Sequence, residues 1–226
     1  MKKRTLINLV LIGIMAFCGY KVINKLNSYD KAEKSMAKVQ SMKSSADDSL
    51  SSQNEDFRFW LKIDNTKINY PVVQGNDNDF YLKHDFFKEE SISGSVFLDY
   101  RVNKDSKNAI IYGHNMKDGS IFKDVELFKD EKFFNNNKFI NITKDNKEYV
   151  YEVFSVYYLS GEKTSHLQTN FNSDKEFSDY LNTVKENSLF QSEKEINLND
   201  IITLSTCSYE GKNFRTVVHA QLVEVK

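Results

Sequence analysis

The pattern of apolar and polar positions changes near residue 57. Beyond it, about eight short apolar runs alternate with polar turns, which is typical of the strands of a barrel or sandwich. Asp145 and Asn146 separate two of these runs as a tight hairpin turn. The pattern therefore predicts a mostly β domain over residues 57–226. Its expected strands are Phe59–Ile63, Ile68–Val73, Ser95–Asp99, Ala109–Tyr112, Phe139–Thr143, Tyr149–Tyr158, Ile201–Cys207 and Phe214–Val225.

One helix is predicted between the sixth and seventh strands. Ser173 and Glu176 have the spacing of a capping box. The apolar residues that follow recur at i, i+3, i+4 and i+7, the spacing of a helix with one buried face. They are Phe177, Tyr180, Leu181 and Val184. A shorter helix is expected over Ile121–Phe128, where three apolar side chains share a face.

The N-terminal segment has the pattern of a membrane anchor. Three basic residues, Lys2, Lys3 and Arg4, precede the uncharged run Thr5–Tyr20, and the apolar character resumes after Lys21. No small-x-small cleavage site follows, so we expect an uncleaved anchor over residues 1–24. The positive-inside rule predicts a single-pass protein of the cell membrane with a cytoplasmic N-terminus and an extracellular β domain. A buried core helix is the alternative.

Residues 25–56 are expected to connect the anchor to the β domain. Up to Met42, apolar residues recur at three- and seven-residue spacings, which predicts a helical stalk with a thin apolar stripe. The stripe consists of Leu26, Tyr29, Met36, Val39 and Met42. The segment Ser44–Asp56 is rich in Ser, Asp and Asn and is expected to be a flexible link.

Composition excludes several functional classes. The chain has 31 Lys and Arg against 32 Asp and Glu, so it lacks the cationic field that attracts nucleic acid. Its two cysteines are too few for a disulfide framework, and no His or Cys spacing indicates a metal site. Neither a Walker loop nor a dinucleotide-binding GxGxxG is present. We therefore expect no metal, no cofactor and no nucleic-acid partner.

Three residues indicate chemistry at the ends of strands. Cys207 ends a β run, and Arg215 begins the next, so a hairpin would bring the two together. His114 follows another apolar run and a glycine, which places it at a similar strand exit. A thiol nucleophile with a histidine acid suits acyl transfer, and Arg215 would stabilise a thiolate or an oxyanion. His219 lies about 13 Å farther along its strand than Arg215, so we do not expect it to share their site. The alternatives are a buried, inert Cys207 or one in an intermolecular disulfide, and a solvated strand residue at position 215.

These residues resemble sortases, and class B sortases in particular. TLSTC at 203–207 matches the sortase TLxTC motif, and Arg215 follows eight residues later. Segments 60–86, 93–101 and 110–122 are also similar to class B sequences, with His114 as the family histidine. The resemblance covers about residues 57–226. It implies a closed β-barrel of about eight strands with N-terminal helices and a helix, from Ser173 to about Asn187, inserted between the sixth and seventh strands.

The resemblance implies a membrane-anchored cysteine transpeptidase that needs no cofactor. Cys207 would attack the threonine carbonyl of a C-terminal sorting signal, NPQTN-like or LPXTG-like, in a secreted protein. His114 would protonate the departing amine, Arg215 would stabilise the oxyanion, and a peptidoglycan-precursor amine of the lipid II type would resolve the thioester. By motif position, the implied walls of the peptide groove are Asn78, Leu82, Tyr112 and Ser205.

One position departs from the class B pattern. Some class B sequences carry an acidic residue directly after the cysteine, whereas this chain has Ser208. The group that orients His114 is therefore left open. Two other functions also remain open: a thiol peptidase that mainly hydrolyses its substrate, and a non-catalytic surface-binding domain.

Overall fold

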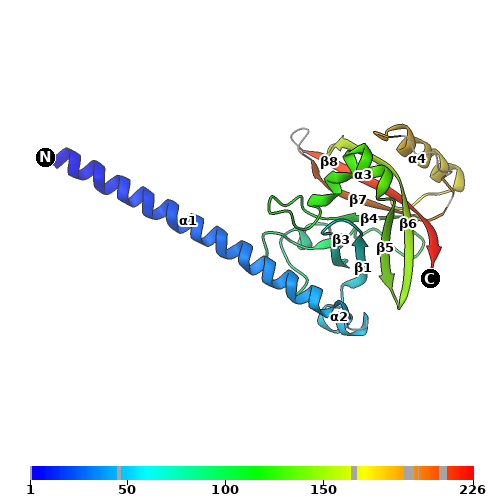
Figure 1. The fold of residues 1–226 in the computed structure, drawn as a ribbon, viewed down its shortest axis with the longest axis horizontal. Coiled ribbons are helices and arrows are strands. Elements are labelled where there is room, and N and C mark those ends of the chain that lie inside the picture. Colours follow the sequence, from blue (N-terminus) through cyan, green and yellow to red (C-terminus); the bar gives the residue numbers. More distant parts are fainter. Residues whose placement is uncertain (1, 45–46, 164–166, 191–195, 198, 209–212) are drawn as a thin grey trace.

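A computed structural model describes residues 2–44, 47–163, 167–190, 196–197, 199–208 and 213–226. A long N-terminal helix leads to a β-barrel with shorter helices around it (Figure 1). Most of the polar connection between Cys207 and Arg215, residues 209–212, lies outside the described residues.

Eight strands close into a barrel, as expected from the sequence. They are β1 (Phe57–Ile63), β2 (Asn69–Val73), β3 (Val96–Leu98), β4 (Asn108–Tyr112), β5 (Phe139–Lys144), β6 (Lys147–Ser160), β7 (Ile201–Ser208) and β8 (Phe214–Val225). Around the barrel they follow the order β1-β2-β3-β4-β7-β8-β6-β5. Strand β4 pairs with β7 in parallel, whereas β7 and β8 are antiparallel. This order places β7, which carries Cys207, between β8, which carries Arg215, and β4, which leads to His114.

The hairpin between β5 and β6 turns where the sequence predicts. Asp145 and Asn146 have φ values of 50° and 58°, and Lys144 pairs with Lys147 on either side of them. Positive φ at both central residues is the requirement of a type I′ turn, and Asp and Asn tolerate it better than most side chains do.

A short helical region packs against the apolar interior of the barrel. The 3-10 helix η3 (Lys123–Lys129) buries Val125 and Phe128, and α3 (Glu131–Asn136) follows it. The helix expected over Ile121–Phe128 therefore begins two residues later than predicted and is of the 3-10 type. Ile121 itself has a φ of 55°, which is incompatible with a right-handed helix, although its side chain is buried in the same core.

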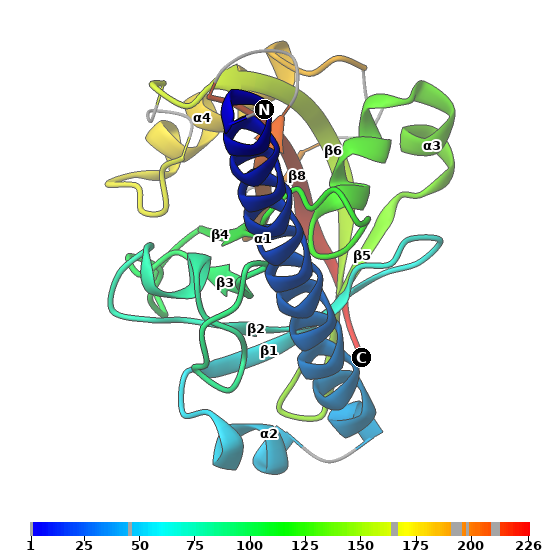
Figure 2. The same ribbon diagram turned by 90° about the vertical axis from the view of Figure 1, so that its left-hand side faces the viewer.

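Helix α4 (Asp174–Glu186) is the predicted insertion between β6 and β7. Ser173 caps it by accepting a hydrogen bond from the Glu176 amide, while the Glu176 carboxylate accepts one from the Asn172 amide. The predicted apolar face of α4 is buried against β6 and β8 outside the barrel. Figures 1 and 2 show α4 and α2 at opposite ends of the molecule.

Helix α1 (Lys2–Ser41) is one continuous helix with two different environments. Its side chains from residue 3 to 27 are exposed, and this part extends away from the barrel (Figure 1). The helix is long and apolar enough to cross a membrane. From Tyr29 onwards it packs against the barrel core.

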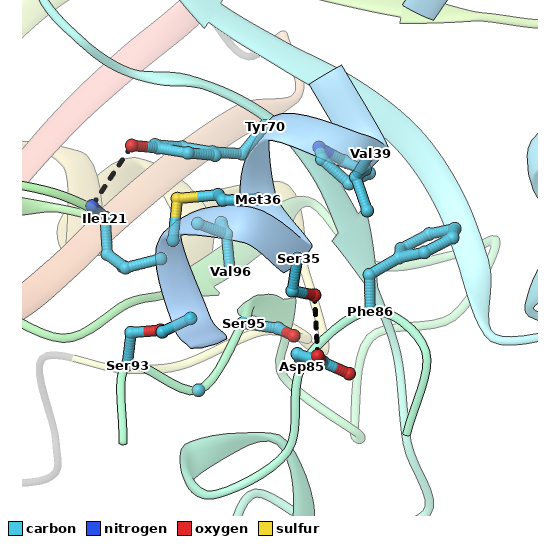
Figure 3. A pocket seen from close by; sticks show the side chains of 13 residues that line it. Ser35, Met36, Val39, Tyr70, Asp85, Phe86, Ser93, Ser95, Val96 and Ile121 are labelled. Carbon is cyan, nitrogen blue, oxygen red and sulfur yellow. Dashed lines mark hydrogen bonds between the residues drawn. The ribbon is translucent and has the colours of Figure 1, made fainter. Parts of the chain in front are cut away.

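The predicted stripe of α1 forms a joint with the barrel. Met36 faces Tyr70 and Ile121, and the Ser35 hydroxyl donates a 2.6 Å hydrogen bond to the Asp85 carboxylate (Figure 3). A cavity of about 30 Å³ remains between helix and barrel. Because Ala32 and Val39 are also buried, the part of α1 from Tyr29 onwards belongs to the packed domain.

The prediction of a flexible link over Ser44–Asp56 is wrong for much of that segment. Helix α2 (Asp47–Gln53) lies there, and the Leu50 side chain is only 2% exposed. The buried Asn54 side chain donates hydrogen bonds to the Tyr81 hydroxyl and to the Phe86 carbonyl. A single apolar residue in a polar segment forms no periodic pattern, so the sequence does not predict its burial. Leu50 is buried because the rest of the fold provides a pocket for it.

Candidate active site

The parallel pair β4–β7 brings two strand exits together. Tyr112 pairs with Ser205 at the carboxyl ends of these strands. Just beyond, the Gly113 amide donates to the Ser205 carbonyl at 3.3 Å, and the Thr206 hydroxyl donates to the Gly113 carbonyl at 2.7 Å. Parallel strands end at the same edge, about 4.8 Å apart. His114, the residue after Gly113, therefore lies beside the strand end that carries Cys207.

Cys207 and Arg215 face each other across the antiparallel pair β7–β8. Their Cα atoms are register partners, as the predicted hairpin requires, and the Cys207 side chain is exposed. Side chains opposite one another in such a pair have Cβ atoms about 5 Å apart. The thiol is thus open to a substrate and next to a permanent positive charge.

Asn115 is a site residue that the sequence reasoning missed. Its Nδ2 donates a 2.7 Å hydrogen bond to the Cys207 carbonyl, which ties the loop after β4 to the end of β7. Gly113 lets the same loop pack closely on Phe122, because a Cβ at that position would lie 2.7 Å from the Phe122 ring. The position of Asn115 directly after His114 was the available signal.

His114 is oriented by a backbone carbonyl. Its Nε2 lies 2.8 Å from the carbonyl oxygen of Leu82, in the 3-10 helix η2 (Phe80–Leu82). A carbonyl oxygen only accepts, so Nε2 carries the proton in this contact. The Leu82 carbonyl therefore orients His114, so no acidic residue is needed directly after the cysteine, where this chain has Ser208. A backbone acceptor gives no residue-type signal in a sequence.

Gly94 allows β3 to approach η2 closely. Its φ is 56°, and a Cβ there would lie 2.5 Å from the Tyr81 carbonyl oxygen and 2.8 Å from that of Leu82. The next residue, Ser95, donates its amide to the Tyr81 carbonyl at 2.9 Å. The Leu82 carbonyl, which holds His114, therefore lies in close contact with Gly94.

A single cleft of about 430 Å³ contains all seven residues that the sequence singled out. Cys207, His114 and Arg215 share it with the four expected wall residues, which are Asn78, Leu82, Tyr112 and Ser205. Ser205 Oγ is buried and has no hydrogen-bond partner among the described residues. Arg101, Asp79 and Leu167 also line the cleft.

His219 lies away from this cleft, in agreement with the sequence reasoning. It is fully buried in β8, where its Nδ1 is 2.8 Å from the Thr203 hydroxyl and its Nε2 is 3.0 Å from the Tyr157 hydroxyl. These contacts are those of a histidine in the core.

A buried carboxylate lies behind the cleft wall. Asp99 is fully buried; burial would raise its pKa, but hydrogen bonds from Arg101 and Tyr112 hold the pKa below its usual value. In return, burial and the negative charge of Asp99 raise the pKa of Tyr112. Sequence reasoning missed Asp99, which it placed only as the last residue of an expected strand.

Comparison with known proteins identifies the family. A family profile described as the sortase domain matches residues 61–223. Sortase B of Listeria monocytogenes is 34% identical over 235 residues, covering 96% of this chain and 95% of that protein. This chain belongs to the sortase family. It is a sortase B-type cysteine transpeptidase.

Solved structures agree with this assignment to class B. The X-ray structure of Clostridium perfringens sortase B has a TM-score of 0.78 at 40% identity and covers 79% of this sortase and 100% of that chain. Bacillus anthracis sortase B in complex with AAEK1 has a TM-score of 0.80 at 34% identity, over 88% and 99% of the two chains. A Staphylococcus aureus sortase B–substrate complex has a TM-score of 0.78 at 30% identity, over 86% and 98%.

Proposed function

We propose that this sortase cleaves a C-terminal sorting signal after threonine and transfers the secreted protein to a peptidoglycan-precursor amine of the lipid II type. One observation carries the proposal. The exposed thiol of Cys207 faces Arg215 across β7–β8 and lies beside His114, and all three line one cleft. This arrangement supplies a nucleophile, a proton donor and a cation at one place.

The first half-reaction forms a thioester. The Cys207 thiolate attacks the threonine carbonyl carbon, and the negative charge that develops on the carbonyl oxygen is met by the Arg215 guanidinium. The C–N bond then breaks. Protonated His114 gives its proton to the departing amine, which would otherwise leave as an unstable anion.

The second half-reaction resolves the thioester. The accepting amine attacks the same carbonyl carbon, and neutral His114 takes up the proton that the amine loses. The C–S bond breaks, the thiolate of Cys207 is restored and a new amide bond joins the surface protein to the precursor. Water in place of the amine would give hydrolysis by the same steps.

The peptide groove is proposed from the walls of the cleft. Asn78, Leu82 and Tyr112 line the cleft, and Ser205 lies on β7, two residues before the nucleophile. Side chains two residues apart on a strand point to the same face. The unpartnered Ser205 hydroxyl thus faces the same space as the thiol and suits a hydrogen bond to the peptide backbone.

We also propose that α1 anchors the enzyme in the cell membrane with the N-terminus in the cytoplasm. Its exposed apolar part and the basic residues Lys2, Lys3 and Arg4 support this orientation. In a Cys18→Ala background, a membrane-impermeant maleimide should label Cys207 in intact cells. Labelling that appears only after the cells are broken would place the barrel inside.

Turnover of defined peptides tests the function. The full-length chain in detergent is incubated with NPQTN-like and LPXTG-like peptides, with and without an added amine. We expect cleavage of one of the two, an amide product when the amine is present, and no cleavage by Cys207→Ala. Free acid as the main product at saturating amine would favour the hydrolase, and an unreactive thiol with peptide binding alone would favour the binding domain.

A further inference from the structure

Asp99 contacts three side chains of the cleft without lining the cleft itself. Its carboxylate accepts hydrogen bonds from Asn78 Nδ2 at 3.1 Å and from the Tyr112 hydroxyl at 3.0 Å. It also accepts two from the Arg101 guanidinium, at 2.9 Å from Nε and 2.7 Å from Nη2. One fully buried carboxylate is therefore the common acceptor for three wall residues.

The three donors come from separate parts of the chain. Asn78 lies in the loop before η2, Arg101 in the loop after β3, and Tyr112 at the end of β4. Arg101 has one further partner in the cleft region, the Leu167 carbonyl at 3.2 Å. Because long polar side chains lose rotamer freedom when they order, a shared buried acceptor that holds them before the peptide arrives improves binding.

Asp99 also changes the charge that a peptide meets. Among the residues that the structure describes, the cleft is lined by two guanidinium groups, of Arg101 and Arg215, and by one carboxylate, of Asp79. Asp99 lies directly behind Arg101 and adds a second negative charge, so the formal charges of these four groups cancel. Since complementary charge contributes to the selection of a partner, an uncompensated charge here would select peptides of opposite sign.

We propose that Asp99 is a positioning residue of this sortase. It holds three side chains of the peptide wall in one arrangement, and it cancels the charge of Arg101 so that the cleft selects an uncharged peptide segment. The proposal rests on the proposed function, because it names the chemistry of the peptide that the same cleft accepts.

Three matched peptides test it on the full-length chain in detergent. One is the neutral sorting peptide, and the others carry a single Glu or a single Lys upstream of the threonine. For Asp99→Asn, we expect KM for the neutral peptide to rise about tenfold or more, the scale of hydrogen bonds to a charged group, with a smaller change in kcat. The preference for the Glu peptide over the neutral peptide should also rise about tenfold.

A second variant changes the same charge pair in the opposite sense. Arg101→Gln leaves Asp99 uncompensated and removes a half-exposed side chain, so it tests the proposal even where Asp99→Asn does not fold. We expect it to favour the Lys peptide over the Glu peptide. In the double variant, the charge preference should return to that of the parent.

Asp85→Asn is the matched control. Asp85 is nearly as buried, at 6% exposed, and its carboxylate accepts from the Ser35 hydroxyl and from backbone amides at the α1 joint. We expect a lower melting temperature with KM and peptide preference within about twofold of the parent. Alkylation of Cys207 by iodoacetamide should be unchanged in every variant.

The outcomes separate the two proposals. A folded Asp99→Asn enzyme with parental KM and parental charge preference would overturn the positioning role while the proposed function stands. Failure of the parent to cleave any of the peptides would count against the proposed function instead. In that case, the affinities of the three peptides for parent and variants, measured by fluorescence anisotropy, still decide whether Asp99 controls the wall.

Discussion

The imidazole Nε2 of His114 donates a 2.8 Å hydrogen bond to the backbone carbonyl of Leu82. The two residues are 32 positions apart and come from β4's exit and from η2, so their contact depends on how these segments pack. Gly94 lies beneath that carbonyl and makes the contact geometrically possible. The position of the proposed proton donor therefore depends on a residue that is not chemically active.

We predict that Gly94→Ala lowers turnover through His114. A Cβ at φ 56° is strained and would clash with the carbonyl oxygens of Tyr81 and Leu82, so η2 must move. Peptide acylation should fall about tenfold or more, whereas Cys207 alkylation stays close to the parental rate. Gly75→Ala is the control, because its Cβ would meet the Tyr81 ring at 3.4 Å and the Asp77 carbonyl oxygen at 3.6 Å, which are ordinary van der Waals distances. Equal activity of the two variants would argue against this support.

His114→Ala should abolish most acylation. Loss of a general acid typically reduces turnover by about 100- to 10,000-fold, and no other histidine lines the cleft among the residues that the structure describes. His219→Gln should retain most of its turnover even if it melts earlier, because His219 lies in the core. Single-turnover acylation and thermal melting of both variants check this. The reverse ranking of the two activities would reassign the acid.

Arg215→Lys separates charge from geometry. Lysine keeps the positive charge but loses the planar set of donors that a guanidinium presents. If Arg215 donates oriented hydrogen bonds to the oxyanion, turnover at saturating peptide should fall about 100- to 1000-fold. Alkylation of Cys207 should stay near normal. A lysine variant within a fewfold of parental turnover would leave Arg215 as an electrostatic or packing residue only.

Two truncations locate the start of the packed domain. Removal of residues 1–26 leaves the joint intact and should give parental melting temperature and turnover, since those side chains are exposed. Removal of residues 1–54 deletes Ala32, Val39 and Leu50, which are buried against the barrel. At about 1.5–3 kcal/mol for each fully buried large apolar side chain, this should lower the melting temperature by many degrees. Equal melting temperatures would show that the joint contributes nothing to stability.

Much of the fold was predictable because its signals are local. The eight strands follow from alternating apolar runs, and the turn at Asp145 and Asn146 follows from residues that accept positive φ. Helix α4 follows from Ser173 and an apolar stripe within the next eleven residues. The grouping of Cys207, His114 and Arg215 in one cleft also agreed with the sequence, since Cys207 and His114 lie at strand exits and Arg215 lies near the start of β8.

The sequence by itself determined the eight strands and helix α4, because those choices depend on residues close together along the chain. Only the tertiary structure decided that Leu50 is buried, that the Leu82 carbonyl holds His114 and that Asp99 joins three walls of the cleft. Each of these depends on partners that are distant in sequence. A backbone acceptor or a pocket for one leucine leaves no periodic pattern, and such contacts exist only once the barrel has closed.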